Sequence, residues 1–270
     1  MEQPRHSGAG IIPLRYRNGL PEFLLGRERE VKDWIGSMRW SGLEGSAKNG
    51  ETVIANALRE SFEESSGLLY KDVADRGRVG DELVRGVYHL KVSVVSDSKE
   101  TMLVSADDAV YRRLKKAHVT FVKLMDLPDD FVEQFKATRA YLLTFSRRRR
   151  VFPPLRGEDG WHDVGPTASL PLPPNAFCDN HPGVRKIQRR NGNVEYVVNE
   201  DYIEKSELRW VSLKELQAAV DGSSSMQLRP LFTIVAEAIC NQFQQSSQHP
   251  SEPPPKVTPV CGTDVQAEGE

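Results

Sequence analysis

The pattern of apolar and polar positions changes once along the first part of the chain, from that of strands to that of a helix. Residues 8–25 are predicted to form two strands around a turn, because apolar positions at both ends flank Asn18-Gly19, a dipeptide typical of tight hairpins. Residues 52–66 instead repeat with a helical period, with small or apolar side chains on one side and glutamates on another. The pattern therefore predicts a hairpin followed by an amphipathic helix.

The same reading places further elements downstream. Strands are predicted at residues 88–95, 118–125, 193–198 and 207–213. Helices are predicted at residues 106–117, 129–145, 214–220 and 228–243. No internal repeat is found along the chain.

Composition changes sharply in two segments. Residues 147–183 begin with a run of four arginines and continue with many prolines and glycines, which predicts an insertion or long loop. Residues 244–270 are rich in Ser, Gln, Pro and Glu and are predicted to be a disordered C-terminal tail. Residues 1–7 are polar and are expected to form an N-terminal tail.

Length and charge limit the function classes. The 270 residues suit one domain with insertions and a tail. The 36 basic and 38 acidic side chains nearly cancel to a net charge of −2, so binding to a nucleic acid or membrane would need a local patch. Three widely separated cysteines exclude a dense disulfide framework or a zinc cluster. No stretch reaches the ~20 apolar residues of a membrane span, and a cytoplasmic or nuclear location is expected.

Three glutamates of the predicted helix are the candidate chemical group. A helix advances ~100° per residue, so Glu60 and Glu64 stand one turn apart on one face, with Glu63 beside them. Like charges at this spacing repel each other by about a few tenths of a kcal/mol per pair. Mg²⁺ prefers oxygen ligands and would remove this repulsion, and the adjacent Arg59 is able to orient a carboxylate. The alternative is a solvated acidic helix face.

The spacing around these glutamates favours the metal hypothesis. The specified positions of the segment 45–68 are Gly45, Glu51, Arg59, Glu60, Glu63 and Glu64. They resemble the Nudix box, Gly-x5-Glu-x7-Arg-Glu-U-x-Glu-Glu-x-Gly-U, where U is a bulky aliphatic residue. Two positions depart from it: Ser61 replaces the aliphatic residue, and the closing glycine comes one place late, at Gly67 after Ser66. The hairpin before the box and residues 202–213 also resemble parts of Nudix proteins.

The resemblance implies a fold and an activity. The fold is a Nudix-type α/β/α sandwich with a mixed β-sheet and large insertions, here as a single enlarged domain at residues 8–243. Nudix proteins use Mg²⁺ or Mn²⁺ and water to hydrolyse a nucleoside diphosphate linked to another moiety. By this resemblance Glu60, Glu63 and Glu64 bind the metal, together with the carbonyl of Gly45, and Arg59 orients Glu60.

The general base and the substrate stay open. The base is either a glutamate of the box or a carboxylate from a separate loop, where the candidates are Glu204, Glu207 and Asp201. The large insertions favour capped RNA 5′ ends, as in mRNA decapping, or diphosphoinositol polyphosphates, while other phosphorylated nucleotides remain open. Candidate substrate-binding residues are Arg147, Arg148 and Arg149. The alternative function is a Nudix-derived, non-catalytic binding module for RNA or a phosphorylated ligand.

Overall fold

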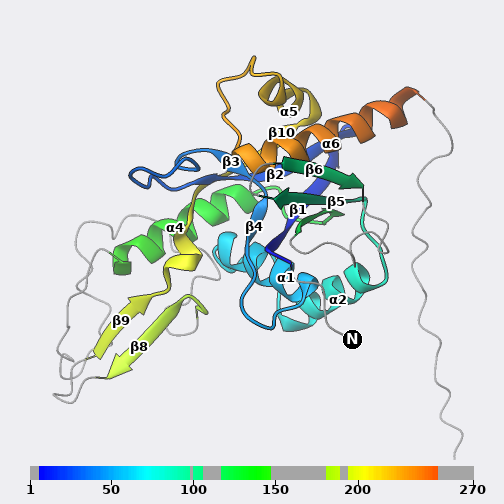
Figure 1. Ribbon diagram of the computed structural model, residues 1–270. Coiled ribbons are helices and arrows are strands. Elements are labelled where there is room, and N and C mark those ends of the chain that lie inside the picture. The colour runs from blue at the N-terminus through cyan, green and yellow to red at the C-terminus, as the bar shows by residue number, and fades with distance from the viewer. Residues whose placement is uncertain (1–5, 98–99, 106–116, 147–180, 189–193, 249–270) are drawn as a thin grey trace, which may run out of the picture.

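The computed structural model describes residues 6–97, 100–105, 117–146, 181–188 and 194–248 (Figure 1). Within these residues no helix has the length and apolar character needed to cross a bilayer.

The N-terminal hairpin has the predicted turn. Strands β1 (Gly8–Arg17) and β2 (Leu20–Glu28) pair in antiparallel fashion up to the Arg17–Leu20 pair. Asn18 and Gly19 both have positive φ, at 52° and 77°. Two positive φ values in a two-residue loop are typical of the turn that matches the twist of a hairpin. The prediction for residues 8–25 is therefore confirmed.

The hairpin lies at the centre of a mixed sheet. Its order is β10-β2-β1-β7-β5-β6, with β3 paired to β2 and β4 paired to β1. The β1–β7 pair is parallel, and the others are antiparallel. The further strands are β3 (Trp40–Ser41), β4 (Leu43–Ser46), β5 (Leu90–Asp97), β6 (Glu100–Ser105), β7 (His118–Leu124) and β10 (Lys205–Ser212).

Helices cover both faces of the sheet. They are α1 (Val53–Glu64), α2 (Val73–Val84), α4 (Phe131–Ser146), α5 (Leu213–Val220) and α6 (Pro230–Gln248). Successive residues of a strand point to opposite faces, so Ile11 packs with residues of α1, α2 and α4 while Ile12 packs with α5 and α6. Figure 1 shows α6 across one face and α1 and α2 on the other. The fold is thus a three-layer α/β/α arrangement around a mixed sheet, as predicted.

A second, small sheet stands beside α4. It contains β8 (Val184–Gln188) and β9 (Val194–Val198), followed by the short 3₁₀ helix η1 (Glu200–Ile203). Val198, Tyr202 and Ile203 pack against Leu142 of α4 in a small apolar cluster. This cluster fixes the chain just before β10 and so places the residues around Glu204.

Several boundaries differ from the predictions. Helix α6 continues to Gln248, so the tail does not begin at residue 244, and Gln244 donates to Gln217 of α5 at 3.0 Å. His181 is buried and bonds the carbonyl of Ser66 through Nε2 at 3.0 Å, so the end of the 147–183 segment is packed rather than loose. The predictions missed α2 and β6. The predicted helix at residues 106–117 lies, except for Ala117, outside the described residues.

Candidate active site

The three box glutamates are buried. Helix α1 begins after Thr52, whose side chain accepts the Ala55 N–H, and directs Glu60, Glu63 and Glu64 toward β4. These side chains belong to residues only 8%, 7% and 3% exposed, and they line a cavity of about 430 Å³. The alternative of a solvated acidic face is therefore wrong. Burial of three carboxylates on one helix demands compensating positive charge.

Arg59 supplies part of that charge. Its guanidinium contacts both oxygens of Glu51, at 2.8 and 2.9 Å. Through Nη1 it also contacts Glu60 and Glu63, each at 2.7 Å. Burial by itself lowers the pKa of Arg59, but Glu51, Glu63 and Glu60 outweigh burial and raise that pKa. One planar fork thus holds three carboxylates, which accounts for the spacing between Glu51 and Arg59 in the sequence.

Gly45 makes room for Glu60. A Cβ atom at residue 45 would lie 2.4 Å from a carboxylate oxygen of Glu60. Real Cβ contacts are not that short, so any side chain here would displace the carboxylate. A glycine is therefore needed at residue 45, because β4 approaches the Glu60 side chain of α1 too closely for any other residue.

Gly45→Ala is expected to keep the fold and to lower affinity for Mn²⁺ by about tenfold, since about 1.4 kcal/mol is tenfold in binding. The added methyl group pushes the Glu60 carboxylate away from its position beside Arg59. Titration with Mn²⁺, followed by electron paramagnetic resonance, measures the change. Gly50→Ala is unsuitable as a control because Gly50 has a positive φ, whereas Gly77→Ala lies in open space on α2 and should leave Mn²⁺ affinity unchanged. Equal affinity in the Gly45 and Gly77 variants would contradict this expectation.

Glu64 is the most buried of the three glutamates. Its Oε2 accepts the backbone N–H of Glu44 at 2.6 Å, and its Oε1 lies 3.0 Å from the ammonium of Lys205. Lys205 comes from the start of β10 and is 1% exposed. Burial raises the pKa of Glu64, with Lys205 acting in the opposite direction. Sequence reasoning missed Lys205, because a lone lysine at a strand start gives no local signal of burial.

Buried Glu44 of β4 is held by two side chains of β7. The Glu44 carboxylate accepts a hydrogen bond from Thr120 Oγ1 at 3.1 Å and lies 2.9 Å from His118 Nε2. Burial by itself raises the pKa of Glu44, but His118, followed by Arg229 and Lys205, lowers it to about 2. Glu44 is therefore ionised, and its backbone N–H is held in place for Glu64.

Glu204 lies in the same cavity as the box glutamates. It follows η1 and lines the cavity together with Asp201. Burial and the nearby Asp201 raise the pKa of Glu204. Glu207, the other candidate base, is not among the residues that line the cavity and instead faces Arg27 at 3.6 Å on the surface. Arg147, Arg148 and Arg149 lie outside the described residues.

Negative charge in the cavity exceeds the positive charge held by Arg59. Burial raises the pKa of Glu60 to about 7, because Arg59 offsets burial only in part and Glu63 and Glu204 add negative charge. Lys48 lies at the rim, 3.5 Å from Glu63 and 3.7 Å from Asp201. A surplus of buried carboxylates is the condition that a further cation relieves.

The donor set fits Mg²⁺ or Mn²⁺. Carboxylate and carbonyl oxygens are the hard ligands that these ions prefer. Within the described part of the chain no three His, Cys, Asp or Glu side chains converge as a ready-made site, since Arg59 and Lys205 take up the carboxylates. Residues able to hold the ion after small rotations are Glu60 and Glu63, and the backbone of Gly45 lies against the Glu60 carboxylate.

The two departures from the box have local explanations. Ser61 is buried at the aliphatic position, and its hydroxyl lies 2.8 Å from the hydroxyl of Tyr70, which satisfies both groups. Ser66 has φ +54°, the left-handed conformation that glycine favours, and its Oγ donates to the carbonyl of Tyr202 at 2.8 Å. Ser61 faces Tyr70 and Ser66 lies in the turn after α1, so neither change removes a carboxylate from the face that carries Glu60.

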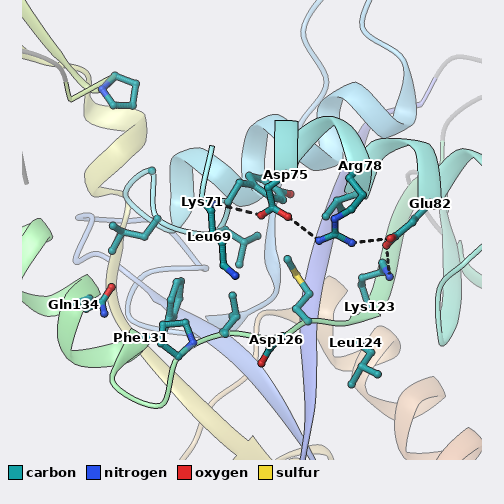
Figure 2. A pocket seen from close by; sticks show the side chains of 18 of the residues that line it. Leu69, Lys71, Asp75, Arg78, Glu82, Lys123, Leu124, Asp126, Phe131 and Gln134 are labelled. Atoms are coloured by element: carbon teal, nitrogen blue, oxygen red, sulfur yellow. Dashed lines mark hydrogen bonds and ion pairs between the residues drawn. The ribbon is translucent and has the colours of Figure 1, made fainter. Parts of the chain in front are cut away.

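A larger cavity, of about 870 Å³, lies between the segment that follows α1, helix α2 and the end of β7 (Figure 2). Its floor is apolar, with Leu69 and Phe131, and a row of paired charges runs along one side. The row is Asp75–Arg78, Arg78–Glu82 and Glu82–Lys123, each pair at 2.7 Å. The described residues that line this cavity do not include the box glutamates, so the two cavities are chemically distinct.

Comparison with known proteins returns structural likeness at low identity. No family model and no curated protein matches the sequence. An Ap4A hydrolase of C. elegans in a binary complex is 11% identical with a TM-score of 0.34, over 87% of this chain and 97% of that one. RenU, a Nudix hydrolase of M. smegmatis, is 12% identical with a TM-score of 0.37, over 90% and 89%. A NUDIX hydrolase of Nitrosomonas europaea is 17% identical with a TM-score of 0.23, over 47% and 51%. The functional argument for this chain therefore depends on its own residues.

Proposed function

We propose that this chain is a pyrophosphohydrolase of the Nudix type that depends on Mg²⁺ or Mn²⁺. The observation that carries the proposal is the burial of Glu60, Glu63 and Glu64 around one cavity. Arg59 contacts both Glu60 and Glu63, and the backbone of Gly45 lies against the Glu60 carboxylate. An arrangement with this much buried negative charge costs stability unless it binds a cation. The spacing of the box in the sequence is what brings Gly45, Arg59 and the three glutamates together.

The residues divide the work of diphosphate hydrolysis. Glu60 and Glu63 hold the divalent cation, and Arg59 fixes the orientation of both carboxylates. When bound, the cation neutralises the diphosphate and makes a coordinated water more acidic. Glu204 is the proposed general base, because it follows η1 into the cavity and its burial raises its pKa above the usual value of a glutamate.

The cavity also offers groups for the rest of the substrate. Arg29, Lys48 and Arg229 line it and supply positive charge for phosphates. Trp34 lines it too and is 38% exposed, with the Arg229 guanidinium 5.4 Å from its ring centre. An exposed aromatic face suits stacking of a nucleobase, which favours a nucleotide-containing substrate such as a capped RNA 5′ end over a diphosphoinositol polyphosphate.

The contacts of Glu64 support a second candidate function. Both of its oxygens are already bonded inside the protein, which would suit a non-catalytic module that binds a phosphorylated ligand. The hydrolase remains the better proposal, because a module that only binds anions gains nothing from the buried glutamates.

A panel assay separates the two candidates. Purified protein is incubated with Mg²⁺ or Mn²⁺ and with a cap analogue, dinucleoside polyphosphates, ADP-ribose and a diphosphoinositol polyphosphate. The hydrolase is expected to split at least one nucleotide at its diphosphate, and chelation of the metal is expected to abolish turnover. Tight binding of a panel member without any turnover would contradict the hydrolase and favour the binding module.

A further inference from the structure

Lys205 is a buried cation between the carboxylates of Glu28 and Glu64. Its ammonium lies 2.6 Å from Glu28 Oε1, 2.8 Å from Ser41 Oγ and 3.0 Å from Glu64 Oε1. An ammonium has three N–H groups, so these oxygens are able to satisfy all of them. The partners come from β2, β3 and α1, all of which lie far from β10 in the sequence.

The surroundings are built for this side chain. Gly26 lies against its stem, where an added Cβ atom would stand 2.8 Å from Cδ of Lys205. The oxygen of Glu28 that accepts from Lys205 is also contacted by Arg229, whose Nη1 lies 3.0 Å from Glu28 Oε1. A lysine is costly to bury unless it is paired, and here it pairs with two carboxylates. The lysine is therefore part of the charge balance of the site.

We propose that the Lys205 ammonium is a built-in cation, which occupies the place beside Glu64 and Glu28 that a divalent ion would otherwise take. The inference rests on the proposed function and deepens it, since it assigns divalent metal to the Glu60 and Glu63 side of the cavity alone. Lys205 is a positioning residue: it holds the Glu64 carboxylate against the backbone N–H of Glu44. A second divalent ion beside Glu64 is disfavoured because like charges repel strongly in a site of low dielectric constant.

Replacement of the lysine should therefore create a metal site. Lys205→Met keeps a stem of similar length but leaves Glu28 and Glu64 without the ammonium. We expect the variant to melt at a lower temperature than the parent chain in EDTA and to recover most of that loss in Mn²⁺. Electron paramagnetic resonance is expected to count about one additional bound Mn²⁺ per chain relative to the parent.

Two further variants serve as controls. Lys123→Met removes another buried lysine, paired with Glu82 at 2.7 Å in the larger cavity, and should lower the melting temperature without any gain in bound Mn²⁺. The double variant Glu28→Gln/Lys205→Met removes a charge of each sign. It is expected to fold in EDTA and to bind no more Mn²⁺ than the parent chain.

The outcomes are distinguishable from a failure of the proposed function. Mn²⁺ counts need no substrate, so a chain that binds Mn²⁺ but hydrolyses nothing contradicts the hydrolase and leaves the role of Lys205 standing. An unchanged Mn²⁺ count in Lys205→Met, or equal gains in Lys205→Met and the double variant, would overturn the inference. Failure of Lys205→Met to fold even in Mn²⁺ would overturn it as well, because the ion is expected to replace the ammonium.

Discussion

Glu60→Gln is expected to lower the rate of Mg²⁺-dependent diphosphate hydrolysis by at least about 100-fold, equivalent to about 2.7 kcal/mol of barrier. The amide has nearly the same shape and still accepts a hydrogen bond from Arg59, so the fold should persist. The variant nevertheless loses the negative charge that lies against Gly45 and faces the cavity. Steady-state kinetics with the best substrate of the panel, together with circular dichroism, measures both effects.

A matched control is available on the surface. Glu133 of α4 has a side chain 70% exposed, far from full burial, and pairs only with Lys136 within its own helix turn among the described contacts. Glu133→Gln is expected to leave the rate unchanged. If Glu60→Gln retained more than about a tenth of the parent rate, a difference of only about 1.4 kcal/mol, Glu60 would not be part of the reacting site.

The same variant tests the charge surplus through pH. The pKa of Glu60 is raised in the folded state to about 7 from 4.5, so this carboxyl lowers stability as pH rises from about 4.5 to 7. In EDTA, the parent chain should therefore lose about 2 kcal/mol of unfolding free energy relative to Glu60→Gln between pH 5 and pH 8. Chemical denaturation at both pH values measures the difference. A difference that does not change with pH would contradict the raised pKa.

Arg59→Ala is expected to reduce the free energy of unfolding in EDTA by about 3 kcal/mol, because removing one partner of a buried ion pair leaves uncompensated charge. The change leaves Glu51, Glu60 and Glu63 close together without the guanidinium that pairs with all three. Hydrolysis should also fall, since the carboxylates lose their orientation. Urea denaturation followed by fluorescence measures the stability, and Mn²⁺ should restore part of it by relieving the same repulsion.

Arg78 offers the matched comparison on α2. It too bridges two carboxylates, Asp75 and Glu82, each at 2.7 Å, but its side chain is 59% exposed. Exposed pairs contribute at most about 1 kcal/mol, so Arg78→Ala should cost about that or less. Equal losses in the two arginine variants would mean that burial around Arg59 is not what makes it important.

Local signals were enough to predict many of the elements. Asn18-Gly19 predicted the hairpin because two residues with positive φ suffice to close it. The helical period of residues 52–66 predicted α1, with the carboxylates gathered on adjacent turns. Helix α2 was missed because Gly77 and Gly80 and a charged sequence weaken its apolar period, which is completed by packing of Val79 and Leu83 on the core.

The sequence alone determined that Glu60, Glu63, Glu64 and Arg59 share one short segment, because their relation is set by helix geometry and needs no distant partner. Only the tertiary structure decided which distant residues pack against these side chains. Lys205 and Glu28 lie 2.6 Å apart although the chain between them runs through most of the fold. Which strands lie side by side, and which of their side chains face inward, follows from the packing of both faces of the sheet rather than from any local pattern.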